Sequence, residues 1–95
     1  MPLLSPADVQ KKLKELPGWR LEGGEIVREF SFSDFVAALQ FVNAVGERAE
    51  AAGHHPDIDI RYNKVKLALV SHDAGGLTER DFDLAKEADA IPTKN

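Results

Sequence analysis

The residues of this sequence best suited to chemistry are its three histidines, His54, His55 and His72. His54 and His55 are adjacent and follow a segment of helical periodicity, whereas His72 follows a segment of strand-like alternation. Histidine gains and loses its proton nearest neutral pH, so three imidazoles in one place would suit proton transfer or metal binding. The function therefore depends on whether the fold brings the three rings together.

Two alternating segments, 56–62 and 65–71, predict a β-hairpin that would do so. Asn63-Lys64 between them suits a two-residue turn, since Asn tolerates positive φ. With this turn the large apolar side chains of both segments share one face, as a half-buried antiparallel pair requires. Continued outward, the same register sets His55 opposite His72. The predicted facing pairs are Tyr62 with Val65, Ile60 with Leu67, and Ile58 with Leu69.

The remaining patterns predict one α+β domain spanning residues 1–95. Ser5 and Thr78 begin segments that resemble capping boxes, Ser33 suits the N-cap of a long helix, and Gly53 suits its end. We expect the order α-β-β-α-β-β-α, with a four-stranded antiparallel sheet and the helices packed on one face. The expected helices cover about 5–16, 33–52 and 78–90, and the expected strands cover 19–22, 25–32, 56–62 and 65–71.

The long helix carries more apolar residues than one sheet contact needs. Its polar residues follow a stripe on one side, and the others form two apolar rows. The second row indicates either wide packing inside the monomer or a subunit interface. The first row is Phe35, Leu39, Val42 and Ala49, the second is Ala38, Phe41, Val45 and Ala52, and the polar stripe is Gln40, Asn43, Glu47 and Glu50.

Composition argues against several classes of function. The net charge of −4 and a pI near 5.3 argue against nonspecific nucleic-acid binding. We expect no membrane span and no secretory signal, because the sequence lacks both a long apolar run and a basic segment before an apolar one. Cysteine is absent, which excludes disulfides and thiolate metal sites and fits a cytoplasmic protein.

Two carboxylates are predicted near the histidines. Glu50 precedes His54 by one helical turn, and Asp81 lies in the first turn of the last helix. Three histidines and a carboxylate could ligate zinc or iron, but adjacent histidines do not easily reach one ion, so we expect no metal. Ser71 beside His72 has no nucleophile motif around it. General acid–base chemistry on a small neutral heterocycle fits the cluster best.

The spacing of these residues resembles the signature of a known family. The string Glu50-x₃-His54-His55-Pro56-x₅-Tyr62-x₉-His72-x₈-Asp81 is similar at every position to that of the pterin-4a-carbinolamine dehydratases, or 4a-hydroxytetrahydrobiopterin dehydratases. The pieces 18–19, 62–65 and 77–81 are similar as well, so the resemblance covers essentially the whole chain.

The resemblance implies a hydro-lyase that converts a 4a-hydroxytetrahydropterin to the quinonoid dihydropterin without a metal or organic cofactor. This reaction recycles the pterin cofactor of aromatic amino-acid hydroxylases, and the family assembles as homodimers and homotetramers. One alternative is another pterin substrate, for example near molybdopterin metabolism. Another is a binding module, because the animal family also serves as a dimerisation cofactor for a homeodomain transcription factor.

The resemblance also implies roles for individual residues. The three histidines would be catalytic, with His55 indispensable and His54 and His72 exchanging acid and base duties. Trp19 either stacks on the pterin ring or is a half-buried strand aromatic. Glu50 and Asp81 would orient the imidazoles and fix their tautomers. The implied substrate-binding residues are Trp19, His54, His55, Pro56, Ser71, His72, Asp73 and Ala74.

Overall fold

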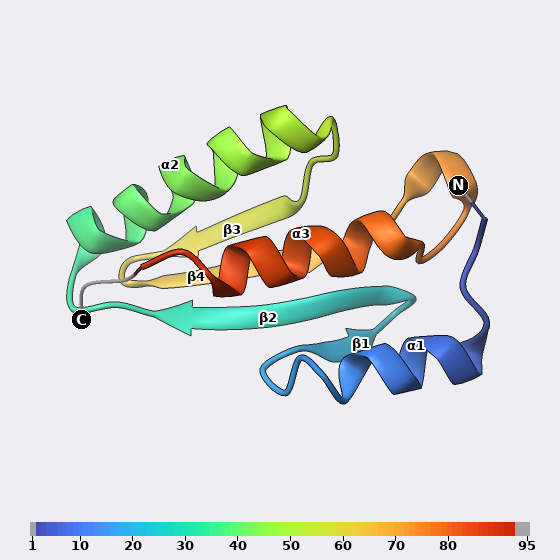
Figure 1. Ribbon diagram of the computed structural model, residues 1–95. Coiled ribbons are helices and arrows are strands. Elements are labelled where there is room, and N and C mark those ends of the chain that lie inside the picture. Colours follow the sequence, from blue (N-terminus) through green and yellow to red (C-terminus); the bar gives the residue numbers. More distant parts are fainter. Residues whose placement is uncertain (1, 93–95) are drawn as a thin grey trace.

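The computed structural model describes residues 2–92 and confirms the predicted order of elements (Figure 1). Each pair of consecutive strands forms a hairpin, and helix α2 joins the two hairpins. The elements are α1 (Pro6–Leu13), β1 (Arg20–Glu22), β2 (Glu25–Ser31), α2 (Phe35–Ala52), β3 (Asp57–Arg61), β4 (Lys64–Leu69), a 3₁₀ turn η1 (His72–Ala74) and α3 (Glu79–Asp89).

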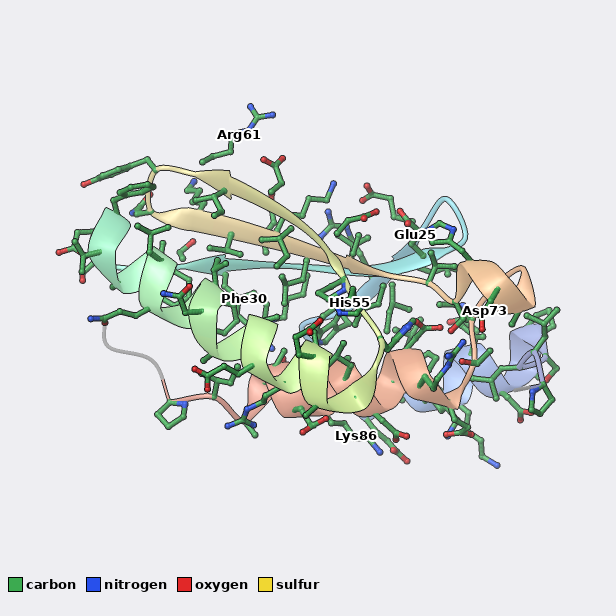
Figure 2. All side chains as sticks on the ribbon, turned by 90° about the horizontal axis from the view of Figure 1, so that it is seen from above. Glu25, Phe30, His55, Arg61, Asp73 and Lys86 are labelled. Carbon is green, nitrogen blue, oxygen red and sulfur yellow. The ribbon has the colours of Figure 1, made fainter. Side chains whose placement is uncertain are left out.

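The four strands form one antiparallel sheet in the order β1-β2-β4-β3. The helices cover one face of this sheet, and the other face is open (Figures 1 and 2). Val65, Leu67 and Leu69 of the central strand β4 are buried beneath the helices. Alternation along a strand directs every second side chain into this core. The architecture thus matches the predicted α+β class.

The register of the second hairpin differs from the prediction by two residues. Its turn is Tyr62-Asn63 rather than Asn63-Lys64, so Ile60 faces Val65 instead of Leu67. Asn63 holds this turn against the end of β2: its side chain donates to the Phe32 carbonyl at 2.8 Å, and its carbonyl accepts from the Phe32 N–H at 2.9 Å.

A shift of two residues leaves every side chain on its predicted face, because strand side chains alternate with a period of two. The apolar pattern therefore could not distinguish the two registers. One consequence concerns the histidines. Asp57 faces Ala68, so the pairing continued outward brings His55 level with Val70 and not with His72. The predicted His55–His72 pairing is thus wrong, and the histidines converge by another route.

Helix α2 divides its apolar rows between the core and the surface. Ala38, Phe41 and Val45 of the second row are buried, and the Phe41 ring packs against the ring of Phe30 at 4.6 Å between centroids. Phe35 of the first row is 45% exposed. The second row therefore packs inside the monomer except for Ala52 at its end, and part of the first row is left on the surface.

The N-terminus of α2 also differs in detail from the prediction. Asp34, not Ser33, is the N-cap, and its carboxylate accepts from the Ala37 N–H at 2.8 Å.

Within residues 2–92, no helix has the length and apolar character needed to cross a membrane.

Candidate functional site

The three histidines line one hollow of about 250 Å³ at one end of the sheet. Four segments meet there: the end of α2, the start of β3, the chain leaving β4 and the first turn of α3 (Figure 1). The predicted convergence of the histidines is therefore confirmed, despite the shifted register. The residues lining this histidine hollow are Gly53, His54, His55, Val70, His72, Asp73 and Arg80.

Gly53 separates the two adjacent histidines from α2. It adopts φ 63°, a left-handed conformation that glycine accepts readily and that ends helices. The next residue is still hydrogen-bonded to α2, because the His54 N–H donates to the Ala49 carbonyl at 3.1 Å. The two imidazoles differ in exposure: the His54 side chain is 8% exposed and that of His55 is 60% exposed. One ring thus belongs to the interior and the other to the rim.

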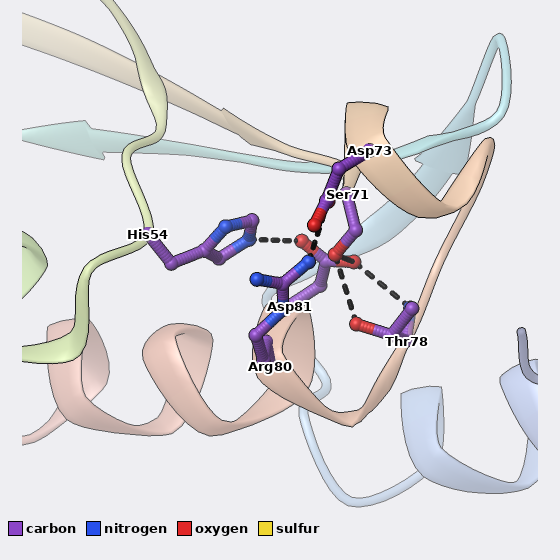
Figure 3. A network of polar contacts seen from close by, with 6 residues as sticks. All are labelled: His54, Ser71, Asp73, Thr78, Arg80 and Asp81. Atoms are coloured by element: carbon purple, nitrogen blue, oxygen red, sulfur yellow. Dashed lines mark hydrogen bonds and ion pairs between the residues drawn. The ribbon is translucent and has the colours of Figure 1, made fainter. Parts of the chain in front are cut away.

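Asp81 anchors the buried ring of His54 (Figure 3). One carboxylate oxygen lies 2.6 Å from His54 Nε2. The other accepts the Ser71 hydroxyl at 2.9 Å and the Thr78 backbone N–H at 2.9 Å. Because Ser71 has one hydroxyl proton and donates it to Asp81, the Thr78 hydroxyl donates to Ser71 Oγ at 2.8 Å. The Asp81 side chain is fully buried, so this network holds the His54 ring from the interior of the protein.

This network has a chemical consequence for His54. A carboxylate only accepts hydrogen bonds, so Nε2 of His54 carries the proton. In the neutral ring Nδ1 is then the unprotonated nitrogen that is free to accept a proton. The predicted orienting role of Asp81 has the geometry it needs.

His55 pairs with the other predicted carboxylate. Its Nε2 contacts a carboxylate oxygen of Glu50, which lies one turn back in α2. Both side chains are exposed, so water competes for this contact. An exposed pair of this kind adds roughly 0–1 kcal/mol to stability. His55 is therefore accessible to a ligand and makes little structural contribution.

His72 begins the η1 turn and is exposed. Within residues 2–92, no side chain is hydrogen-bonded to its ring. Beside it Asp73 pairs with Arg80 at 2.6 Å. The hydrogen bond from the Arg80 guanidinium lowers the pKa of Asp73, so this carboxylate keeps its charge further into the acid range. Arg80 was not among the predicted site residues; its place directly before Asp81 was the available signal.

Three of the predicted substrate-binding residues do not line the histidine hollow: Ser71, Ala74 and Pro56. The Ser71 N–H donates to the Gly76 carbonyl, and the Ser71 carbonyl accepts from the N–H groups of residues 74–76. The backbone groups of Ser71 and the Ala74 N–H are therefore satisfied within the loop. Pro56 is half-buried and does not line the histidine hollow.

Trp19 lies in the core and not at the histidine hollow. It is 4% exposed, meets Phe30 edge to face at 6.3 Å, and donates its indole N–H to the Asp89 carboxylate at 3.0 Å. Asp89 ends α3, whereas Asp81, which holds His54, lies in its first turn. Stacking on a ligand among the histidines does not fit this position. Trp19 instead ties the loop before β1 to the end of α3.

The described residues contain no group of three or more His, Cys, Asp or Glu side chains arranged around a possible metal position. The hollow instead presents His54 and His55, each paired with its own carboxylate, together with the His72 ring. Imidazoles gathered around one hollow suit transfer of protons to and from a bound molecule.

The comparison with known families agrees with this arrangement. The model of the family described as pterin 4 alpha carbinolamine dehydratase matches residues 2–91. This chain belongs to the pterin carbinolamine dehydratase family. Family membership supports dehydratase function in general. Five residues of the string above line the histidine hollow or contact a histidine that does: Glu50, His54, His55, His72 and Asp81.

Two curated relatives and two solved structures document the similarity to this dehydratase family. Proteins named for the family from Acidobacterium capsulatum and Chloroflexus aurantiacus are 63% and 59% identical over 91 residues, covering 96% of this chain and 99% and 98% of theirs. A structure titled transcriptional coactivator/pterin dehydratase, from Brucella melitensis, has a TM-score of 0.88 at 33% identity, covering 93% of this chain and 96% of that one. A pterin dehydratase-like RuBisCO assembly factor of the alpha-carboxysome shares the fold alone, with a TM-score of 0.68 at 23% identity, covering 82% and 93%.

Proposed function

We propose that this protein dehydrates a 4a-hydroxytetrahydropterin to the quinonoid dihydropterin by general acid–base catalysis in the histidine hollow. In this reaction the C4a–O bond breaks and the hydroxyl leaves as water after it receives a proton. N5 loses its proton, and a C4a=N5 double bond forms. One group must therefore give a proton and another must take one. The observation that supports the proposal most is the presence of all three histidines around one hollow.

The positions of the three imidazole rings suggest how the acid and base roles are divided among them. His55 is on the rim beside Glu50 and reaches the ligand without displacing a structural contact. His54 has Nε2 committed to Asp81 and Nδ1 available, and His72 lines the same hollow. We assign His55 as indispensable, with His54 and His72 exchanging acid and base duties. The proton taken from N5 restores the one given to the hydroxyl, so the site returns to its initial state.

The proposed physiological role is to recycle the pterin cofactor of aromatic amino-acid hydroxylases in the cytoplasm. The reaction chemistry is the same for a related 4a-hydroxypterin, for example one near molybdopterin metabolism. The substituent that the pterin carries would distinguish these two pathways.

The proposal is tested by mixing the purified protein with freshly generated 4a-hydroxytetrahydropterin and following the ultraviolet absorbance of the quinonoid product. We expect formation of the product well above the spontaneous rate, in proportion to protein concentration and without added metal. A folded protein that leaves the spontaneous rate unchanged would remove the dehydratase assignment.

A second candidate function is protein binding through α2, which a surface feature and one relative favour. Phe35, Val36 and Leu39 form an exposed apolar patch on the first turns of this helix. The Brucella melitensis protein is titled both coactivator and pterin dehydratase. We propose that a second copy of this chain covers the patch, giving a homodimer or homotetramer. Exposed apolar groups gathered in this way mark association surfaces.

The double substitution Phe35→Glu with Leu39→Glu should reduce the mass of the particle in solution to that of a smaller assembly. Charges at an apolar interface lose hydration without gaining a partner, so association becomes unfavourable. Light scattering measures the mass. Gln40→Glu, on the exposed polar stripe of the same helix, adds a charge outside the patch and should leave the mass unchanged. A double variant with the mass of the wild type would place the interface elsewhere.

A further inference from the structure

His72 differs from the other two histidines of the hollow in how it is held. His54 and His55 each have a carboxylate in contact with the ring. Within residues 2–92, no side chain is hydrogen-bonded to the ring of His72, and the residue begins a 3₁₀ turn of three residues. The position of this ring therefore depends on how the chain on either side of it is held.

Both sequence neighbours of His72 are bound to consecutive residues at the start of α3. The Ser71 hydroxyl donates to the Asp81 carboxylate at 2.9 Å, and Arg80 donates to the Asp73 carboxylate at 2.6 Å. Figure 3 shows the side chains of Ser71 and Asp73 directed towards this turn of the helix. His72 thus lies between two points at which the chain is attached to one helical turn.

The two attachments differ in their surroundings. Ser71 and Asp81 are fully buried, and their contact belongs to the network that holds His54. Asp73 and Arg80 line the histidine hollow themselves, and the Asp73 side chain is 71% exposed. An exposed ion pair contributes little to stability, because water competes for both groups. The pair of Asp73 and Arg80 is therefore placed to act on the site rather than to hold the fold.

Arg80 is more enclosed than its partner. Its side chain is 27% exposed, and its Nε is buried without a hydrogen-bond partner among the described residues. An unsatisfied buried N–H group costs stability, so stability alone does not account for an arginine at this position. Because α3 is itself anchored by buried apolar side chains, its enclosed arginine gives Asp73 a fixed partner.

We propose that Arg80 and Asp73 are positioning residues, whose ion pair fixes the η1 turn and with it the His72 ring for proton transfer. The proposal rests on the dehydratase function proposed above. A proton is transferred efficiently only between groups within hydrogen-bond reach, and a misplacement of about 1 Å can cost on the order of 10²-fold in rate. Consecutive residues of α3 then orient two histidines: Asp81 acts through the ring of His54, and Arg80 through the chain beside His72.

The pair persists over the range of pH in which histidines exchange protons. The hydrogen bond from Arg80 lowers the pKa of Asp73, so the carboxylate is charged throughout this range. Arginine keeps its own charge there as well. The turn is therefore held in the same way whether the imidazoles of the hollow are protonated or neutral, as a site that both gives and takes protons requires.

The first test measures kcat and KM in Asp73→Asn, in Arg80→Gln and in the double variant. We expect kcat to fall about tenfold in each single variant, because the turn loses an attachment, with KM changed by less than about threefold. The double variant should be no slower than the single ones, since the two side chains act as one pair. Unchanged kcat in the single variants, or additive losses of about 10²-fold in the double variant, would overturn the proposal.

The direction of the change separates positioning from a simple effect of charge. Asp73→Asn leaves the positive charge of Arg80 uncompensated at the hollow, whereas Arg80→Gln leaves the negative charge of Asp73. These opposite charges favour opposite protonation states of a nearby imidazole, so an electrostatic role would move kcat in opposite directions. A fall of kcat in both variants supports positioning, and opposite changes would contradict it.

Glu79→Gln is the matched control. Glu79 directly precedes Arg80, pairs with Lys12 at 2.9 Å and does not line the histidine hollow. Its substitution removes the same charge from an ion pair of the same helical turn, so kcat should stay that of the wild type. Urea denaturation should give similar midpoints for all these variants. An equal loss of kcat in the control, or unfolding of the Asp73→Asn variant at much lower urea, would remove the positioning role.

A measurement without turnover keeps this proposal apart from the proposed reaction. Relaxation of ¹³C in the His72 ring reports how rigidly the ring is held on the ps–ns timescale. The ring should be more ordered in the wild type and in Glu79→Gln than in Asp73→Asn. That result in a protein without dehydratase activity would keep the positioning of His72 and remove the reaction. An equally ordered ring in Asp73→Asn, in an active enzyme, would keep the reaction and remove the positioning role.

Discussion

Replacing His55 by alanine is expected to lower dehydratase turnover by at least about 10²-fold while the fold survives. A positioned acid or base typically contributes about 10²–10⁴-fold to a rate, which sets the size of the effect. The fold should survive because the His55 side chain is 60% exposed and its described polar contact is with Glu50, which is exposed as well. Turnover and the free energy of unfolding in urea are measured on the same preparation.

The control for this prediction is Asp59→Asn, an exposed change on β3 that lies outside the histidine hollow. It should alter neither turnover nor stability by a measurable amount. Full turnover in a folded His55→Ala protein would contradict the role assigned to His55. The three-histidine arrangement would then depend on His54 and His72 alone.

Substitution of Asp81 should have the largest effect on stability of any change in the site. Asp81→Ala leaves His54 Nε2, the Ser71 hydroxyl and the Thr78 N–H without their common acceptor in a buried place. Each unsatisfied buried group costs about 1–3 kcal/mol, so we expect a loss of roughly 3–5 kcal/mol in the free energy of unfolding. Urea denaturation measures this loss. Single domains have only about 5–15 kcal/mol in total, so the variant is close to unfolding.

Asp81→Asn separates the chemical role from the structural one. The amide keeps the shape of the carboxylate but presents an NH₂ group as well as an oxygen. If the NH₂ group faces His54, the ring must carry its proton on Nδ1, and the nitrogen that served as acceptor is lost. We expect turnover to fall by about 10²-fold or more with a smaller loss of stability than in Asp81→Ala.

The readout specific to this role is the tautomer of His54, observed by ¹⁵N chemical shifts. A shift of the proton from Nε2 to Nδ1 together with low turnover supports the positioning role of Asp81. Unchanged turnover in a folded Asp81→Asn protein would limit Asp81 to stability. Asp83→Asn, an exposed change in the same helix, is the matched control and should leave turnover, stability and tautomer as they are.

Much of this site could be predicted from the spacing of residues. Caps and glycines mark the ends of α2 and α3 in the sequence, and those ends bring His54 and Asp81 to one place. Glu50 in the last turn of α2 and His55 just after the Gly53 cap are five residues apart, so their contact also depends on the local course of the chain. Such features depend on neighbours in the chain, and local patterns record them directly.

Other features depend on contacts between distant parts of the chain. The hairpin register depends on the contact of Asn63 with Phe32, the residue after β2. An alternating apolar pattern does not distinguish registers that differ by two residues. Similarly, either apolar row of α2 satisfies its helical pattern, and the packing of Phe41 against Phe30 decides which is buried.

The same division holds at the site. The sequence by itself determined the element order, the faces of the strands and the set of histidines and carboxylates, because these follow from periodicity, caps and spacing. Only the tertiary structure decided that Trp19 binds Asp89 in the core, that Ser71 supports Asp81, and that Arg80 binds Asp73 beside His72. The physical reason is that each of these contacts joins groups whose proximity is created by packing and not by the local course of the backbone.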